Sequence, residues 1–198
     1  MISEQLLNTT FSFHGHRCLG IPLGLRCGLT ALKTLGVNRA KNSELHLIAE
    51  LGNNHAVGCF LDGIMAATGC TFGKFNIETI YHNKLAFTLI DKKTNRGVRI
   101  RLKDEYVEKM LKSPFMKLRK EGILPQNIES DIATTSINDI VNMPEFEFME
   151  ISEIKSITLP KKMGCPNTTL CSNCGELFFI NKNTTKDSIC AGCYKNGK

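Results

Sequence analysis

The chain has 198 residues, of which 42% are hydrophobic, and its formal net charge is +6 at neutral pH. This length and composition allow one sizeable core and a small appendage. A charge of this size is typical of a solvated surface, so nucleic-acid binding is not the favoured explanation of the basic residues.

The sequence also argues against two classes of protein. No run of apolar residues approaches the roughly 20 that span a bilayer, and the first stretch, MISEQLLNTTFSF, lacks the regions of a secretory signal. We therefore expect a cytoplasmic protein without a membrane partner. The nine cysteines include two C-x-x-C pairs and leave an odd residue over, which disfavours a disulfide framework and favours metal binding.

The first candidate site is the stretch FHGHRCLG at residues 13–20. His14, His16 and Cys18 alternate there, immediately before a helical pattern. If the stretch is extended, the alternation puts three metal-binding side chains on one side. Cys18 would also precede a helix N-terminus, where free N–H groups favour a thiolate.

Two helices and a strand follow. Apolar residues at spacings of three and four predict a helix over 20–35 that ends at Gly36, and Cys27 is expected to be a core residue of it. A strand is predicted over 44–51, and a second helix runs from His55 to a stop at Gly69. Cys59 and Asp62 share one edge of that second helix. They could face the first candidate site; alternatively, Cys59 is a core thiol and Asp62 pairs with a lysine.

The loop CTFGKFN at residues 70–76 contains a thiol and an amine between glycines. Cys70 and Lys74 are therefore candidate cofactor-binding residues, with Lys74 able to anchor an anionic ligand. A Walker-type phosphate loop is rejected, because that motif has a different glycine spacing and a Ser or Thr after the lysine.

The remaining pattern of the first domain predicts strands and then helices. Three short strands over 79–82, 85–90 and 98–102 are expected to form a meander. Helices are predicted over 104–112, 115–121 and parts of 130–141, and an extended piece between 146 and 157. The order predicts an α+β domain over residues 1–160, in which helices pack on one mixed sheet.

Residues 165–198 carry the most specific motif. Cys171 and Cys174 form one C-x-x-C pair, and Cys190 and Cys193 form the other after fifteen residues. This spacing matches a structural zinc site with four thiolates. About 30 residues bury too small a core to fold alone, so the metal must supply folding free energy. A hairpin is expected between the two pairs, a redox role would need one pair to be unligated, and Cys165 is assigned no role.

Four motifs carry a resemblance to a known family: HGHRCLG at 14–20, CFLDGI at 59–64, TGCTFGK at 68–74 and KLAFT at 84–88. Over roughly residues 11–102 the chain resembles the E-subunit family of formylmethanofuran dehydrogenase. The resemblance implies an α+β core, usually dimeric, and a treble-clef or ribbon-type zinc finger as an appendage. The sequence departs from the family's pattern at Leu19, where proline is usual, and at Phe75, where glycine is usual.

The resemblance also implies a cleft, where the segment with His14 and His16 meets the helix with Cys59 and Asp62. It implies a setting in methanogenesis-type one-carbon metabolism, beside molybdenum or tungsten enzymes that convert carbon dioxide to a formyl group on methanofuran. The large subunits of that complex carry its active centre, so members of the E-subunit family need not be enzymes.

Three hypotheses follow. In the first, His16, Cys18 and Cys59 bind a second zinc or another transition metal at an open site, and His14, Cys18 and Asp62 are candidate catalytic groups. In the second, the protein is a non-catalytic assembly subunit that docks to a larger molybdenum or tungsten oxidoreductase. The third, nucleic-acid binding by the finger, rests on six lysines. They are Lys161, Lys162, Lys182, Lys186, Lys195 and Lys198.

Overall fold

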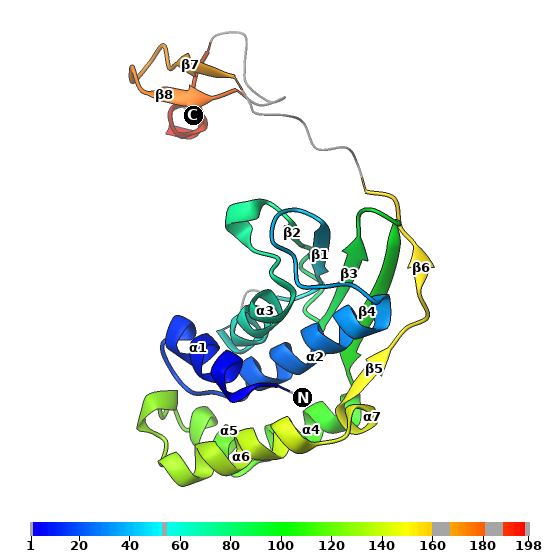
Figure 1. Ribbon diagram of the computed structural model, residues 1–198. Coiled ribbons are helices and arrows are strands. Elements are labelled where there is room, and N and C mark those ends of the chain that lie inside the picture. Colours follow the sequence, from blue (N-terminus) through cyan, green and yellow to red (C-terminus); the bar gives the residue numbers. More distant parts are fainter. Residues whose placement is uncertain (1, 53–54, 160–166, 181–187, 197–198) are drawn as a thin grey trace. The chain divides into compact units, whose positions relative to one another are not determined.

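The protein is described by a computed structural model that covers residues 2–52, 55–159, 167–180 and 188–196, with the backbone alone at 55–56 and 195–196. The chain separates into two compact units, Met1–Leu159 and Pro160–Lys198 (Figure 1). In the described ranges, every helix is too short or too polar to cross a membrane.

A mixed sheet forms the base of the first unit, with the strand order β2-β1-β3-β4-β5. β2 runs parallel to β1, the other neighbours along this order are antiparallel, and β6 pairs with β4. The strands are β1 (Leu45–Ala49), β2 (Ile77–Thr79), β3 (Ala86–Asp91), β4 (Arg96–Leu102), β5 (Met149–Ile151) and β6 (Lys155–Ser156). The predicted α+β class with helices on one mixed sheet is confirmed.

The predicted meander is wrong, because β2 lies on the far side of β1 from β3. The strand expected over 79–82 also starts earlier, at Ile77. Asn76 supplies the physical reason. Its buried side chain donates to the carbonyl oxygens of Asn42 and Leu45, and its own carbonyl accepts from the N–H of Leu47. These bonds hold the start of β2 against β1.

Three helices pack together beside the sheet: α1 (Glu4–His14), α2 (Gly20–Leu35) and α3 (His55–Thr68) (Figure 1). The two longer ones confirm the predicted helices. α2 ends at Gly36 and α3 is followed by Gly69, and both glycines have the left-handed φ that helix stops favour. Cys27 is fully buried in α2 and its pKa is raised by desolvation, so it is the expected core thiol.

α2 and α3 approach one another closely where glycines meet. A β-carbon at Gly24 of α2 would overlap the carbonyl oxygen of Phe60, and one at Gly63 of α3 would overlap that of Ile21. Only glycine leaves the backbones free to touch at this point. The contact brings the N-terminal end of α2 against Cys59, since a β-carbon at Gly20 would lie 2.6 Å from the Cys59 β-carbon.

A second group of helices follows β4 and lies against α2 (Figure 1). These helices are α4 (Asp104–Leu111), α5 (Pro114–Lys120), α6 (Ser130–Asn142) and α7 (Glu145–Phe148), with the 3-10 turn η2 (Pro125–Asn127) between α5 and α6. Arg26 of α2 connects these helices to α2. Its guanidinium donates to the carbonyl oxygens of Ile140, Val141 and Met143. It also lies 4.7 Å from the centre of the Phe148 ring, in a cation–π contact.

Two details of the first unit concern the expectations from the sequence. The extended piece expected from residue 146 begins only at Met149, because 145–148 form the short helix α7. Phe75, which stands where the family has glycine, caps the turn η1 (Phe72–Lys74) with a left-handed φ of 50°. A residue with a β-carbon is strained there, which explains the family's preference for glycine.

The second unit consists of a hairpin and a short helix. β7 (Thr168–Leu170) pairs antiparallel with β8 (Leu177–Phe179), and α8 (Ala191–Asn196) follows. The first cysteine pair lies in the turn of this hairpin. The hairpin expected between the two pairs would have its turn at residues 181–187. Residues 181–187 and Cys165 lie outside the described ranges.

Candidate metal centres and the adjoining pocket

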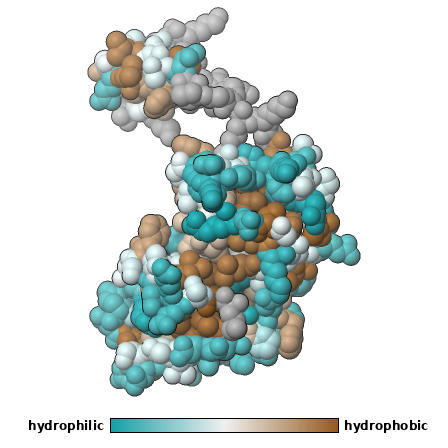
Figure 2. All heavy atoms as spheres, in the orientation of Figure 1, coloured by the Kyte–Doolittle hydropathy of each residue, from teal (hydrophilic) through white to brown (hydrophobic). Residues whose placement is uncertain are grey.

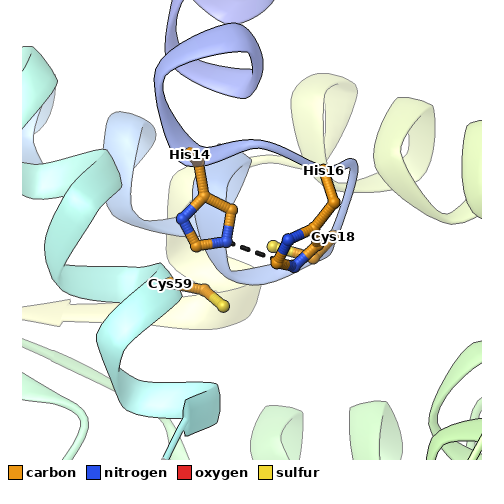
Figure 3. Close-up of side chains that lie close together, drawn as sticks. All are labelled: His14, His16, Cys18 and Cys59. Atoms are coloured by element: carbon orange, nitrogen blue, oxygen red, sulfur yellow. Dashed lines mark hydrogen bonds between the residues drawn. The ribbon is translucent and has the colours of Figure 1, made fainter. Parts of the chain in front are cut away.

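Four metal-binding side chains converge in the first unit: His14, His16, Cys18 and Cys59. One ligand atom from each lies within 4.8 Å of all the others, and Figure 3 shows the side chains turned toward one another. The local path differs from the extended segment expected. His14 is the last residue of α1, and Gly15, with a φ of 93°, turns the chain so that His16 and Cys18 fold back beside it.

The two histidines present a spacing that a metal requires. His14 Nε2 and His16 Nε2 lie 3.2 Å apart, and a tetrahedral zinc with Zn–N bonds of about 2.05 Å holds two nitrogens roughly 3.3 Å apart. His14 Nδ1 lies 2.7 Å from Asp62 Oδ2. An Nδ1–H donated to this carboxylate leaves the Nε2 lone pair directed at the cluster, and metal-binding histidines are commonly oriented by such a carboxylate.

The two thiols of this cluster differ in acidity. The pKa of Cys18 is lowered to about 6, chiefly by a hydrogen bond from the Cys59 thiol, and further by the backbone N–H groups of Ile21 and Gly20 at the start of α2. The same hydrogen bond, together with burial, raises the pKa of Cys59. This direction agrees with the thiolate expected at Cys18, and a thiolate of this kind is ready to bind a metal.

The second cluster consists of Cys171, Cys174, Cys190 and Cys193, whose sulfur atoms also lie within 4.8 Å of one another. The sulfurs of Cys174 and Cys190 are 4.0 Å apart, close to the roughly 3.8 Å expected for Zn–S bonds of about 2.3 Å in a tetrahedron. The backbone N–H of Cys190 donates to Cys171 Sγ, and this bond does most to lower the pKa of Cys171 to about 6. The arrangement is consistent with a small zinc-binding site.

A pocket of about 560 Å³ adjoins the first cluster. His16, Cys18 and Cys59 line one part of it, whereas His14 is not among its lining residues. The opposite wall belongs to α4, α5 and the turn η2. Its side chains from these elements are Val107, Met110, Leu111, Phe115, Met116, Arg119, Lys120 and Pro125. On the face shown in Figure 2, hydrophobic residues gather across the first unit between hydrophilic margins.

The other predicted site residues lie apart from this cluster. Cys70 is fully buried in the core and its pKa is raised to about 11, mainly by desolvation. The Lys74 ammonium lies 3.3 Å from the carbonyl oxygen of Ala40 and 3.5 Å from that of Lys41. Neither residue lines the pocket beside the cluster.

The pocket wall was missed by sequence reasoning. Residues 104–112 and 115–121 were predicted only as helices, and Leu111, an apolar residue of the first of them, lines the pocket while 36% exposed. A signal was present, because Met110, Phe115 and Met116 are large apolar residues at the junction of two short helices. The pattern does not say that this junction lies over the cysteines.

A family model described as "FmdE, Molybdenum formylmethanofuran dehydrogenase operon" matches residues 13–150. The chain belongs to this family. The match extends beyond the roughly 11–102 that the motifs suggested, so α4, α5 and η2, which supply the pocket wall, are part of the family region. This chain therefore carries both the cluster and its pocket within one matched segment.

Two relatives show how far the likeness reaches. The chain is 28% identical over 201 residues to a protein of Archaeoglobus fulgidus named "Probable S-adenosyl-L-methionine-binding protein", covering 96% of this chain and 52% of that protein. It thus spans about half the length of this curated relative. A crystal structure of a tungsten formylmethanofuran dehydrogenase FmdE-like protein from Syntrophus aciditrophicus has a TM-score of 0.58 and 20% identity, covering 98% of this chain and 92% of that one. At that identity the likeness supports the fold.

Proposed function

We propose that this chain is a zinc protein with two metals of different roles, one structural in the finger and one reactive in the cleft. His16, Cys18 and Cys59 would hold the cleft metal, with His14 Nε2 close enough to complete the set. The observation that carries the proposal is the convergence of four donor atoms within 4.8 Å beside a pocket of about 560 Å³. A mixed set of imidazoles and thiolates suits zinc and neighbouring transition metals.

A metal in the cleft would supply a Lewis-acid position for a ligand that enters the pocket, because zinc sites can expand from four to five ligands. The chain's own groups support such a role. A molecule in the pocket meets the faces of His16, Cys18 and Cys59. The Asp62 carboxylate, 2.7 Å from His14 Nδ1, would orient His14 Nε2 toward the bound metal. The one-carbon setting and the dimeric state implied by the family belong to the same proposal.

A second candidate function is that of an assembly subunit of a molybdenum or tungsten oxidoreductase. The family's description supports it, and so does the surface of the finger. Leu170, Leu177 and Phe179 of its hairpin are each at least 62% exposed, and exposed apolar side chains of this size are common at docking surfaces.

The nucleic-acid hypothesis rests on the sequence alone. Of its six lysines, only Lys195 lies in the described ranges, and its side chain is not described. The name of the Archaeoglobus fulgidus relative makes S-adenosylmethionine a further candidate ligand of the pocket. It therefore belongs among the probes in any binding experiment on this pocket.

Metal analysis of the intact chain tests the main proposal. We expect two zinc-like ions per chain by inductively coupled plasma mass spectrometry. Cys59→Ala should remove one ion and Cys174→Ala the other, while Cys27→Ala, a matched change of a buried thiol outside both clusters, should retain both. A single ion that is lost only with Cys174→Ala would refute the cleft metal.

A further inference from the structure

The pocket beside the cluster has an apolar body. Leu19, Leu23, Phe60 and Leu85 line it on one side, and Met110, Phe115 and Met116 on the other. Few of its lining groups can form hydrogen bonds. A ligand rich in hydroxyl or amide groups would bury many of these groups without hydrogen-bond partners, which disfavours its binding. The body of the pocket therefore favours a largely apolar molecule, and methionines adapt well to such ligands.

The charge around the pocket has one sign. Arg119 and Lys120, at the end of α5, line it, and no acidic side chain is among its lining residues. Arg119 Nη1 donates to the carbonyl oxygen of Ile123 at 2.5 Å, which anchors the guanidinium and leaves its other N–H groups. Within the described ranges, neither cation takes part in an ion pair. An acid group of a ligand would complement them.

The two parts of the pocket define one class of ligand. We propose that the pocket binds an amphipathic organic acid, with its acid group at Arg119 and Lys120, its apolar chain over Met110, Phe115 and Met116, and its far end at His16, Cys18 and Cys59. The placement of the ligand's far end rests on the proposed function, which puts a metal at these three residues. A terminal thiol suits it best, because thiolates are strong ligands for the metals that bind such a donor set. The volume of about 560 Å³ is that of a small-molecule site.

Calorimetric titration of the full, metal-loaded chain tests the acid end. The probes are octanoate, its neutral amide octanamide, 8-mercaptooctanoate and S-adenosylmethionine. We expect octanoate to bind at least tenfold more tightly than octanamide. The double variant Arg119→Gln/Lys120→Gln should weaken octanoate at least tenfold. Its matched control is Lys112→Gln/Lys117→Gln, which removes two exposed cations that do not line the pocket and should change little.

Separate measurements test whether the far end of the ligand binds at His16, Cys18 and Cys59. We expect 8-mercaptooctanoate to bind more tightly than octanoate and to change the visible spectrum of the cobalt-substituted protein. Both effects should vanish in Cys59→Ala, while octanoate still binds to that variant. A single ion per unaltered chain, lost only with Cys174→Ala, would refute the proposed function, yet the comparison of octanoate with octanamide would still decide whether the pocket selects an acid.

Three results would overturn the proposed ligand class. Octanamide binding as tightly as octanoate would show that the cations do not select an acid. Equal weakening by the two double variants would show a general charge effect. S-adenosylmethionine binding more tightly than either acid, and unaffected by Arg119→Gln/Lys120→Gln, would assign the pocket to a different ligand.

Discussion

The two cysteine-containing clusters of this chain are assembled in different ways. In the finger, the turn of the β7–β8 hairpin and the start of α8 bring all four thiols together, and the described part of this unit buries little besides Cys171. In the cleft, the donors come from the end of α1, the segment before α2, and α3, and they sit against a large core. We therefore expect the finger to depend on a bound metal for its structure, whereas helix packing already positions the donors of the cleft.

This difference predicts that metal removal has the largest effect of all, and that it acts on the finger. Removal of metal by a chelator should unfold the finger completely, because structural zinc contributes roughly 10–16 kcal/mol to such modules. The first unit should stay folded. Hydrogen exchange followed by mass spectrometry should show loss of protection in residues 168–179 and none in 20–35. Cys174→Ser should reproduce the pattern without chelator. Simultaneous loss of protection in both units would show that the cleft, too, is held by metal.

A substitution at the contact between α2 and α3 should destabilise the first unit and leave the finger folded. Gly24→Ala places a β-carbon against the Phe60 carbonyl oxygen, and forcing α2 from α3 should cost about 1–3 kcal/mol or more. It should also weaken metal binding in the cleft and leave the finger unchanged. Denaturant unfolding and metal titration would measure both. Gly58→Ala is the control, because nothing lies near its added β-carbon and alanine favours a helix by about 0.5–1 kcal/mol. If Gly24→Ala behaves like Gly58→Ala, the close contact is not what positions the cluster.

The smallest effect concerns the support of His14. Asp62→Asn removes the charge that holds the His14 Nδ1–H, and changes of this kind lower metal affinity about 10- to 100-fold. We expect competition titrations to show this loss at the cleft alone, with unfolding nearly unchanged. Asp131→Asn, at an exposed acid in α6, is the matched control. An unchanged affinity would mean that Asp62 does not act through His14 on a bound metal.

The sequence predicted those features that depend on neighbouring residues. The finger cluster follows from cysteine spacing alone, and α2 and α3 follow from apolar periodicity and their glycine stops. The parallel pairing of β2 was missed because it depends on Asn76 bonding to the carbonyl oxygens of Asn42 and Leu45, which no local pattern reveals. For the same reason, the sequence did not indicate that α4 and α5 wall the pocket.

The cluster in the cleft was predicted only in part. The sequence grouped His14, His16 and Cys18 by assuming an extended strand-like path, and the structure groups them through a helix end and a turn at Gly15. Their meeting with Cys59 depends on the contact between Gly24 and Gly63. Spacing alone does not predict such a tertiary contact.

That glycine contact also bears on the order in which metals are captured. Because α2 and α3 pack together before any metal ion binds, the conformational entropy of bringing the cleft donors together is already lost when the first unit folds. Capture of an ion in the cleft is then a simple encounter, limited by access and by loss of bound water. In the finger, capture must wait for loop closure and proceeds together with folding. A newly made chain exposed to scarce metal should thus fill its cleft on a faster timescale than its finger.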